Sequence, residues 1–244
     1  MEEKLRRAID VLKGAKRVCA FTGAGISVES GIPPFRGKDG LWSKFDPIIL
    51  DINYFLRNPD KSWRLIKQIF YDFFGKARPN PGHYALAELE RKQVVRAIIT
   101  QNIDNLHQEA GSKVVYEFHG NSRDLVCIDC ARKFPAREKV GADLPPRCDN
   151  CGGLLKPDFV FFGEPIPEPA RSLSSKEAEI SDVFLVIGTT GEIQPASMIP
   201  FLAKQNMAFI IEVNIEESNY TRSITDVFLR GKASEVLSVI VGEI

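Results

Sequence analysis

The chain has 244 residues, of which 44% are hydrophobic and 26% charged, a composition typical of one large globular domain with room for a small one. Its 32 basic and 32 acidic side chains give a formal net charge of zero, which argues against binding to nucleic acid or to an anionic membrane through overall charge. No apolar run approaches the roughly 18 residues of a membrane span, and the N-terminal residues do not form an export signal. We therefore expect a cytoplasmic protein with no membrane partner and no direct nucleic-acid binding.

Predicted strands and helices alternate along the chain, after an amphipathic N-terminal helix. Seven short apolar runs rich in β-branched and aromatic residues are predicted strands, namely residues 17–21, 94–99, 114–118, 159–162, 183–187, 209–213 and 226–229. Helical patterns occupy residues 84–91, about 168–180, 234–241, and a segment after Pro195 that Pro200 must kink or restart. The alternation predicts an α/β fold, a Rossmann-like parallel sheet with helices on both faces.

Two insertions interrupt this pattern. Residues 38–80 are rich in aromatic side chains and predict a helical insertion, and residues 121–156 carry paired cysteines. Neither is long enough to bury a large core alone, so together they are expected to form a small second domain. Residues 1–37, 81–120 and 157–244 then form the discontinuous Rossmann-like domain, and the cleft between the domains is the expected ligand site.

Four of the five cysteines form two C-x2-C pairs, Cys127 with Cys130 and Cys148 with Cys151. This spacing is typical of a zinc site, because each turn can aim two thiolates at one tetrahedral centre. Disulfides are the alternative, and a cytosolic chain disfavours them. Four cysteines leave no open position for water on the metal, so the predicted zinc is structural.

Glycine or polar side chains follow nearly every predicted strand. These positions are Thr22-Gly23-Ala24-Gly25, Gln101 to Asp104, His119-Gly120, Gly163-Glu164, Gly188-Thr189-Thr190 and Asn214. Open parallel sheets bind ligands at the carboxyl ends of their strands, so the set predicts a lined crevice.

Two of the strand-end loops suit a pyrophosphate and its riboses. Gly23-Ala24-Gly25 begins like a dinucleotide fingerprint, but Val28 stands where the third glycine belongs, so an ordinary tight turn explains this loop equally well. The Gly188 loop offers the same small residue with two added hydroxyls. Asn214 could hold ribose hydroxyls or simply make a local turn bond.

The sequence contains only three histidines that could serve as a general acid or base. His119 ends an apolar run and precedes a glycine, so it is either a general base in the crevice or a hydrogen-bonded structural histidine. His83 and His107 lie in helical segments and can be capping or packing residues.

Taken together, these motifs resemble those of the sirtuins, NAD-dependent protein lysine deacylases, in their prokaryotic type. The resemblance covers about residues 4–241 and rests on Gly23-Ala24-Gly25-Ile26-Ser27, Ser30-Gly31-Ile32-Pro33, Phe35-Arg36-Gly37, Thr100-Gln101-Asn102-Ile103-Asp104, His119-Gly120, the cysteine pairs, Phe162-Gly163-Glu164 and Gly188-Thr189-Thr190. It implies a Rossmann-like domain, a small domain made of zinc and helical modules, and deacetylation of lysine that yields nicotinamide and O-acetyl-ADP-ribose.

The resemblance also implies catalytic roles for two residues. His119 would deprotonate a ribose hydroxyl of NAD, and Asn102, with Gln101, would hold the nicotinamide ribose and an ordered water. Asp104 and the backbone of Ile103 would bind the nicotinamide carboxamide.

The remaining implied contacts surround the cofactor and the substrate. Phe35 would shield the reactive sugar carbon, and Arg36 would contact the phosphates. Further cofactor contacts would be Gly23, Ala24, Gly25, Ser27, Val28, Gly188, Thr189 and Thr190, with Asn214, Glu216 and Ala233 toward the adenosine end. An acetylated lysine-containing peptide would add as a strand at Gly163 and Glu164, with Val160 and Phe162 forming an apolar tunnel for the lysine stem.

Two departures from the family pattern bear on activity. Gly191 stands where sirtuins usually have leucine after the Gly-Thr-Ser or Gly-Ser-Ser motif, so NAD affinity could be altered. The Tyr-x-x-Arg pair of sirtuins that prefer acidic acyl groups is replaced by Tyr71 and Phe74, which predicts a preference for uncharged acyl groups. The alternatives to a deacylase are a protein mono-ADP-ribosyltransferase and a non-catalytic sensor of NAD or ADP-ribose.

Overall fold

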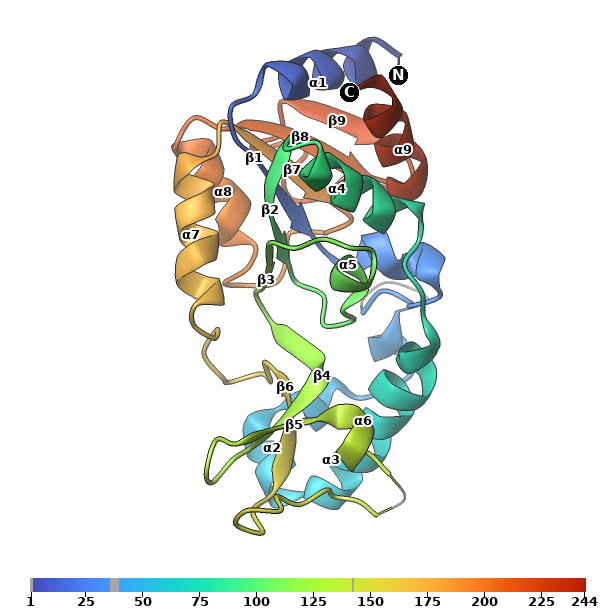
Figure 1. Cartoon of the computed structure of the whole chain (residues 1–244), viewed down its shortest axis with the longest axis vertical. Helices are drawn as coiled ribbons and strands as arrows, with labels where there is room; N and C mark the ends of the chain where they lie inside the picture. The colour runs from blue at the N-terminus through green and yellow to red at the C-terminus, as the bar shows by residue number, and fades with distance from the viewer. Residues whose placement is uncertain (1, 36–39, 142) are drawn as a thin grey trace.

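The computed structural model describes residues 2–35, 40–141 and 143–244, and leaves the side chains of residues 73 and 74 undescribed. Its main sheet has six parallel strands, which run across the upper half of Figure 1. In spatial order they are β3 (Val115–Glu117), β2 (Val95–Thr100), β1 (Val18–Thr22), β7 (Val183–Ile187), β8 (Phe209–Asn214) and β9 (Val227–Arg230). β1 and β7 are buried along their whole length, as expected for strands covered on both faces.

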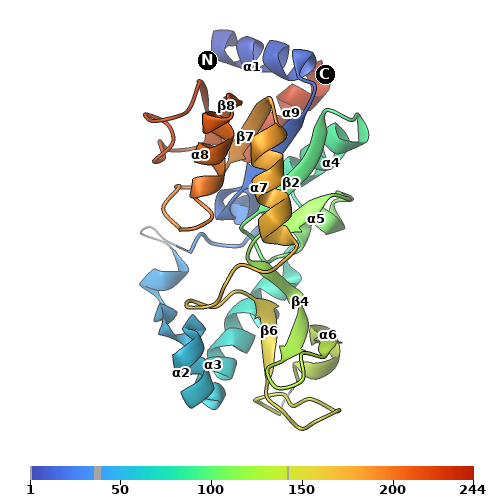
Figure 2. The same cartoon turned by 90° about the vertical axis from the view of Figure 1, so that its left-hand side faces the viewer.

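Helices cover both faces of this sheet. One face carries α1 (Glu2–Gly14), α4 (Pro81–Arg91) and α9 (Ala233–Glu243), and the other carries α7 (Ala170–Ile180) and α8 (Met198–Gln205) (Figures 1 and 2). Alternate residues of one strand enter the two cores. Val18 and Ala20 pack under α1, α4 and α9, whereas Cys19 and Phe21 pack under α7 and α8.

A second, antiparallel sheet lies at the other end of the molecule (Figure 1). β4 (Gly120–Cys127) pairs with β5 (Lys133–Pro135) and β6 (Leu155–Phe159). Its helical neighbours are η2 (Leu41–Ser43), η3 (Pro47–Leu50), α2 (Ile52–Arg57), α3 (Pro59–Ile66), the π-helix η4 (Lys67–Phe73), η5 (Phe74–Lys76) and α6 (Ala136–Lys139). Residues from both predicted insertions share one core here, including Trp63, Leu125 and Cys148.

The predicted strand at residues 159–162 is wrong as a member of the parallel sheet. β6 ends at Phe159 and belongs to the second sheet. The run is apolar because Phe159 and Phe161 pack into the second core, where their rings contact Phe70 and Phe55 respectively.

The other predicted elements agree with the structure to within a few residues. α8 begins at Met198, so Pro200 lies in the first helical turn, where a missing N–H leaves no hydrogen bond unmade and no kink is needed. The α/β fold, a parallel sheet with helices on both faces, is confirmed; the small second sheet was not predicted, and the domain boundaries stay a prediction. Among the described residues, no helix has the length and apolar character needed to cross a bilayer.

The order of the strands defines where a ligand can bind. From β1 the chain proceeds to β2 and β3 on one side, and later to β7, β8 and β9 on the other. The carboxyl ends of β1 and β7 therefore flank the topological switch point of the sheet, where open α/β proteins bind their ligands.

Candidate active site and zinc centre

Two glycine loops contact each other at the switch point. Gly23 and Gly25 follow β1 at the start of the short helix η1 (Ala24–Ser30), and Gly188 follows β7 with φ of +60°. The Gly25 N–H donates to Gly188 O at 2.8 Å, and a Cβ on Gly25 would lie 2.6 Å from Gly188 Cα. Both positions need glycine because the two backbones touch. The sequence analysis predicted that these small residues admit a phosphate. The structure shows that the packing of the two loops requires them in any case.

Asn102, Ser27 and Asp104 form a hydrogen-bonded cluster beside these loops. Asn102 Nδ2 donates to Gly23 O and to Ser27 Oγ, both at 3.1 Å. Ser27 Oγ donates to Asp104 Oδ2 at 2.6 Å, and Asp104 Oδ1 accepts the Leu106 N–H at 3.0 Å. Burial raises the pKa of Asp104, and these two donated bonds oppose the rise. The structure thus joins three predicted site residues from two separate loops.

His83 supports this cluster from behind. The Asn80 N–H donates to His83 Nδ1 at 3.3 Å, so the ring proton sits on Nε2, which faces Ser27 Oγ at 3.4 Å. Ser27 accepts there, because its own proton goes to Asp104. Asn80 and His83 also form the capping box of α4. His83 is therefore a capping residue, one of the two roles that its sequence position suggests, and it also orders the protons of the site.

His107, on α5 (Leu106–Glu109), lies next to His83. Its Nε2 lies 2.9 Å from Thr22 Oγ1, and Thr22 Oγ1 lies 2.9 Å from Thr100 Oγ1. The rings of His83 and His107 meet edge to face at 5.0 Å. Burial lowers the pKa of both histidines, that of His83 to about 4, and His83 lowers the pKa of His107 further. Both rings are neutral at physiological pH.

The buried His83 makes stability depend on pH. Its pKa lies below the ordinary value of 6.5, so its contribution to stability is complete above pH 6.5 and is lost as the pH falls to about 4. We expect this residue to account for about 3 kcal/mol of lost unfolding free energy over that range. Urea unfolding at pH 7 and at pH 4.5 measures it. His83→Gln, which keeps a capping side chain, should lose less stability on acidification than the wild type; equal losses would contradict the assignment.

His119 follows β3 at the point where the chain enters β4. Its Nδ1 lies 3.0 Å from Gln101 O, and a carbonyl can only accept, so Nδ1 carries the proton and Nε2 has a free lone pair. Burial lowers the pKa of His119, and the bond to Gln101 O partly offsets this. Gly120 has φ of +73°, and a Cβ there would collide with Asp158 O on β6. The bond to Gln101 O and the burial of the ring therefore make His119 a neutral imidazole with its proton on Nδ1. The lack of space at Gly120 holds the next residue of the chain against β6.

Several of the remaining predicted cofactor residues lie at the same edge of the sheet. Gln101 Nε2 donates to Thr189 Oγ1 at 3.1 Å, and Asn214 Nδ2 donates to Thr189 O at 3.1 Å. Ser122 donates to Ile103 O through both its backbone N–H and its hydroxyl. Several of the others are partly or largely exposed: Ala24, Val28, Phe35, Thr190 and Glu216. Ala233 is buried at the start of α9. Arg36 lies outside the described residues.

Tyr220 fills the space beside Gly191. Gly191 has φ of +73°, and a Cβ there would lie 2.8 Å from the fully buried Tyr220 ring. Tyr220 OH donates to Ser197 O at 3.1 Å, and the adjacent Asn219 N–H donates to Thr190 O at 3.0 Å. The packing group that leucine would supply at position 191 therefore comes from a different loop.

Gly191→Ala should be strongly destabilising. The left-handed conformation costs an L-residue about 1–2 kcal/mol, and the collision with Tyr220 adds an overpacking cost of about 1–3 kcal/mol. Gly111→Ala is the matched control, because Gly111 has φ of +107° but open space around its Cα. Chemical denaturation should show the larger loss for Gly191→Ala, and equal losses would exclude the packing role of Tyr220.

The aromatic and substrate segments lie between the two sheets. Phe35 contacts Trp42 and Phe70, with ring centroids 5.5 and 6.4 Å apart. A cavity of about 410 Å³ lies nearby, and its described lining contains none of the predicted site residues: Pro33, Leu41, Lys44, Phe45, Gln68, Ile69 and Asp72. Phe162, 47% exposed, pairs through its backbone with Leu50 O and the Ile52 N–H.

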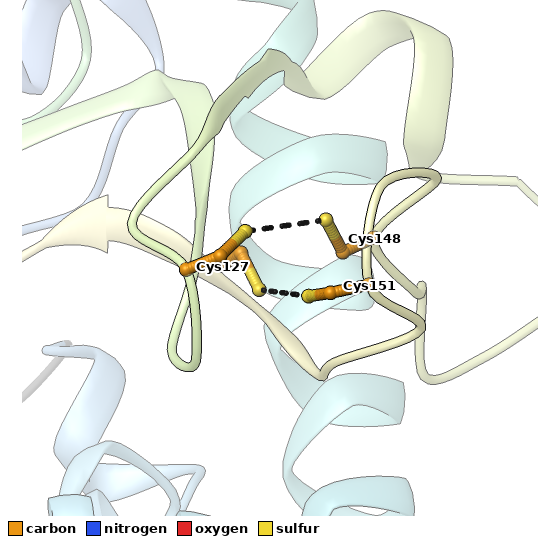
Figure 3. Close-up of side chains that lie close together, drawn as sticks. Cys127, Cys148 and Cys151 are labelled. Atoms are coloured by element: carbon orange, nitrogen blue, oxygen red, sulfur yellow. Dashed lines mark hydrogen bonds between the residues drawn. The ribbon is translucent and has the colours of Figure 1, made fainter.

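The four cysteines converge at the far end of the second sheet. Cys127 Sγ lies 3.5 Å from Cys151 Sγ, Cys130 Sγ lies 3.7 Å from Cys148 Sγ, and all four sulfurs lie within 4.8 Å of one another (Figure 3). A tetrahedron with Zn–S bonds of ~2.3 Å has S–S edges of about 3.8 Å, whereas a disulfide needs about 2.05 Å. The residues fit a structural zinc ion, as predicted.

The sequence interpretation missed the second layer of the site. Thr100 accepts the Asn102 N–H, Thr22 donates to Thr100, and Asn80 donates to Ser30. Thr22 and Thr100 belong to the quoted motifs, but none of the three was given a role of its own. The Asn-Pro-x-His pattern that begins at Asn80 is a recognisable helix start and could have suggested its capping role. The contacts of the two threonines depend on strand register and carry no sequence signal.

A parallel sheet whose switch point carries a neutral histidine of fixed tautomer, together with a four-cysteine cluster that fits zinc, is the arrangement expected of a dinucleotide-binding enzyme of the α/β class. Residues 23–195 match the model of the Sir2 family. NAD-dependent protein deacylase 2 of Pyrobaculum aerophilum is 46% identical over 239 residues, covering 96% of this chain and 94% of the relative. NAD-dependent protein deacylase 2 of Archaeoglobus fulgidus is 45% identical over 249 residues, covering 100% and 97%.

Solved structures agree with these relatives. A Sir2 homologue–NAD complex has a TM-score of 0.90 and 41% identity, covering 97% of this chain and 92% of that chain. A Sir2–p53 peptide–NAD⁺ complex has a TM-score of 0.90 and 31% identity, covering 98% of each chain. The chain belongs to the Sir2 family.

Proposed function

We propose that this chain is an NAD-dependent protein lysine deacetylase with one structural zinc ion. It takes NAD and an acetylated lysine as substrates and yields nicotinamide, O-acetyl-ADP-ribose and deacetylated lysine. Relatives at about 45% identity across nearly the whole chain carry the names NAD-dependent protein deacylase and deacetylase. The structural observation that carries the proposal is the fixed tautomer of His119 next to the Asn102 and Asp104 cluster.

His119 supplies the base. Its Nδ1–H bond to Gln101 O leaves Nε2 free to accept a proton, and burial keeps the ring neutral at physiological pH. The acyl oxygen of the acetyl-lysine attacks the ribose carbon as its bond to nicotinamide breaks. Nε2 then takes the proton of a ribose hydroxyl, whose oxygen attacks the carbon of the resulting imidate, and addition of water releases the lysine amine and O-acetyl-ADP-ribose. A positioned base of this kind is typically worth a factor of ~10²–10⁴ in rate.

The residues that orient NAD come from five segments, each of which follows a strand of the main sheet. Asp104 and Asn102 hold the nicotinamide and its ribose, with Ser27 fixing both side chains. Thr189 and Thr190 face the phosphates and riboses, supported by Asn219. Toward the adenosine end lie Asn214, Glu216 and Ala233.

The acetylated peptide adds as a strand beside residues 160–164. In this segment Val160 O and the Gly163 N–H have no hydrogen-bond partner among the described residues, so they are available to a peptide backbone. Val160 and Phe162 line the path of the lysine stem. Acetylated lysine-containing proteins are the proposed partners, and a cytoplasmic location stays a prediction.

Incubation with NAD and an acetyl-lysine peptide, followed by mass analysis of the products, tests the function. We expect loss of the acetyl group from the peptide together with nicotinamide and O-acetyl-ADP-ribose. Stable transfer of ADP-ribose to protein would instead identify a mono-ADP-ribosyltransferase. Binding of NAD without peptide-dependent nicotinamide release would identify a sensor.

The acyl preference is a separate prediction. The hydroxyl of Tyr71 is buried without a hydrogen-bond partner among the described residues, and the side chain of Phe74 lies outside them. No Tyr-x-x-Arg pair is available in this helix to bind a carboxylate. We expect kcat/KM for an acetylated peptide to exceed that for the succinylated form of the same peptide by at least tenfold. Faster removal of succinyl would refute the prediction.

A further inference from the structure

Lys156 on β6 has a buried ammonium group. The residue is 5% exposed, although lysine is rarely found at that depth in a protein. Its Nζ donates to Pro157 O at 2.8 Å and Phe159 O at 2.7 Å, and it pairs with Glu164 Oε2 at 3.0 Å. Three acceptors match the three N–H donors of an ammonium, so the buried charge is fully satisfied.

The acceptors of Lys156 close a loop between residues 157 and 164. Glu164 Oε2 also accepts the Phe161 N–H at 2.7 Å, and Lys156 Nζ lies 4.2 Å from the centroid of the Phe161 ring. The loop is thus folded around one ammonium group. Removing one partner of a buried ion pair leaves the other charge uncompensated, so this conformation depends on Lys156.

The same loop carries the proposed peptide-binding backbone. At one end, the Val160 N–H donates to His119 O at 2.8 Å. In the middle, Phe162 pairs with residues 50–52. At the other end, Lys156 holds Glu164. Glu164 Oε2 is therefore occupied inside the protein, so the loop offers its backbone, rather than this oxygen, to a substrate strand.

We propose that Lys156 is a positioning residue for the acylated substrate. Its ammonium group fixes the loop in the conformation that presents Val160 O and the Gly163 N–H to a peptide strand. The inference rests on the proposed deacetylase function and adds to it a residue that touches neither NAD nor the reacting atoms.

Lys156→Met tests the inference, since methionine keeps most of the apolar stem and removes the charge. We expect KM for the acetylated peptide to rise at least tenfold, while KM for NAD changes less than threefold. Lys133→Met is the matched control, because Lys133 forms an exposed ion pair with Asp158 of the same sheet. Its two KM values should match those of the wild type.

Two further measurements separate positioning from general destabilisation. Amide hydrogen exchange at Phe161 and Phe162 should be faster in Lys156→Met than in Lys133→Met, with exchange in β1 and β7 unchanged. Should Lys156→Met fail to fold, Glu164→Gln decides, since it keeps an acceptor for Lys156 but removes the opposite charge. A threefold or larger rise in peptide KM is expected for that variant.

Folded variants at positions 156 and 164 with unchanged peptide KM would overturn the inference, as would equal rises in both KM values. These outcomes leave the proposed function intact if the wild type still deacetylates the peptide. A wild type that fails to consume NAD in the presence of acetylated peptide would contradict the function itself.

Discussion

His119→Ala should abolish deacetylation while leaving NAD binding largely intact. Loss of the base removes a factor of ~10²–10⁴, which corresponds to about 3–5 kcal/mol of activation free energy. The ring is held by Gln101 O, and its removal breaks no bond within the Ser27 and Asp104 cluster. Steady-state kcat and calorimetric titration with NAD measure the two effects.

The pH dependence of the same reaction checks the role of the imidazole. Because burial lowers the pKa of His119 below 6.5, the base stays active at neutral pH and is lost only when the pH falls below its lowered pKa. The acid limb of kcat/KM should therefore have its midpoint below pH 6.5 and be absent from the residual activity of His119→Ala. Turnover of that variant within tenfold of the wild type would remove His119 from the chemistry.

Cys148→Ala should unfold the protein, and the loss of activity would follow from the unfolding. Cys148 is buried in the core that the two insertions share, and its sulfur is one of four that enclose the metal position. Structural zinc contributes on the order of 10–16 kcal/mol in small modules, far more than a domain of this size can spare. We expect aggregation or a large drop in melting temperature, with zinc content below one ion per chain.

Cys19→Ala is the control for this result. Cys19 is also fully buried, but it lies on β1 and far from the other four cysteines in the fold. That variant should retain zinc and its fold. A folded, active and zinc-free Cys148→Ala protein would show that the metal has no structural role.

The main sheet could be predicted because its strands are buried on both faces. Continuous apolar runs such as residues 183–187 are typical of strands of this kind. The zinc centre followed from spacing alone, since two C-x2-C turns constrain the geometry before any fold is known. In both cases the signal is local, so it survives in the sequence.

The run at residues 159–162 shows where this approach fails. Aromatic residues that fill a shared core give the same apolar signal as a buried strand, and only the partners Phe55 and Phe70, far away in sequence, distinguish them. Lys156 shows the opposite failure. A lysine is normally exposed, and its three acceptors become visible only when the loop is folded.

Most of the predicted cofactor residues that the structure describes gather at one edge of the main sheet, but their roles stay predictions. Contact between Asn102 and Ser27, or between Gln101 and Thr189, required the strand register that only the structure supplies. The tautomer of His119 likewise depends on a carbonyl 18 residues away.

The chain crosses between the two sheets at 119–120 and again at 159–160, and the crossing strands touch there, with no room for a side chain on Gly120. If the zinc-binding segment were replaced by one from another protein and packed slightly differently, the shift would therefore displace His119 directly. Chimeras of this protein should therefore be joined after Asp124 and before Lys156, so that the contact between residues 119–120 and 158–160 is kept unchanged.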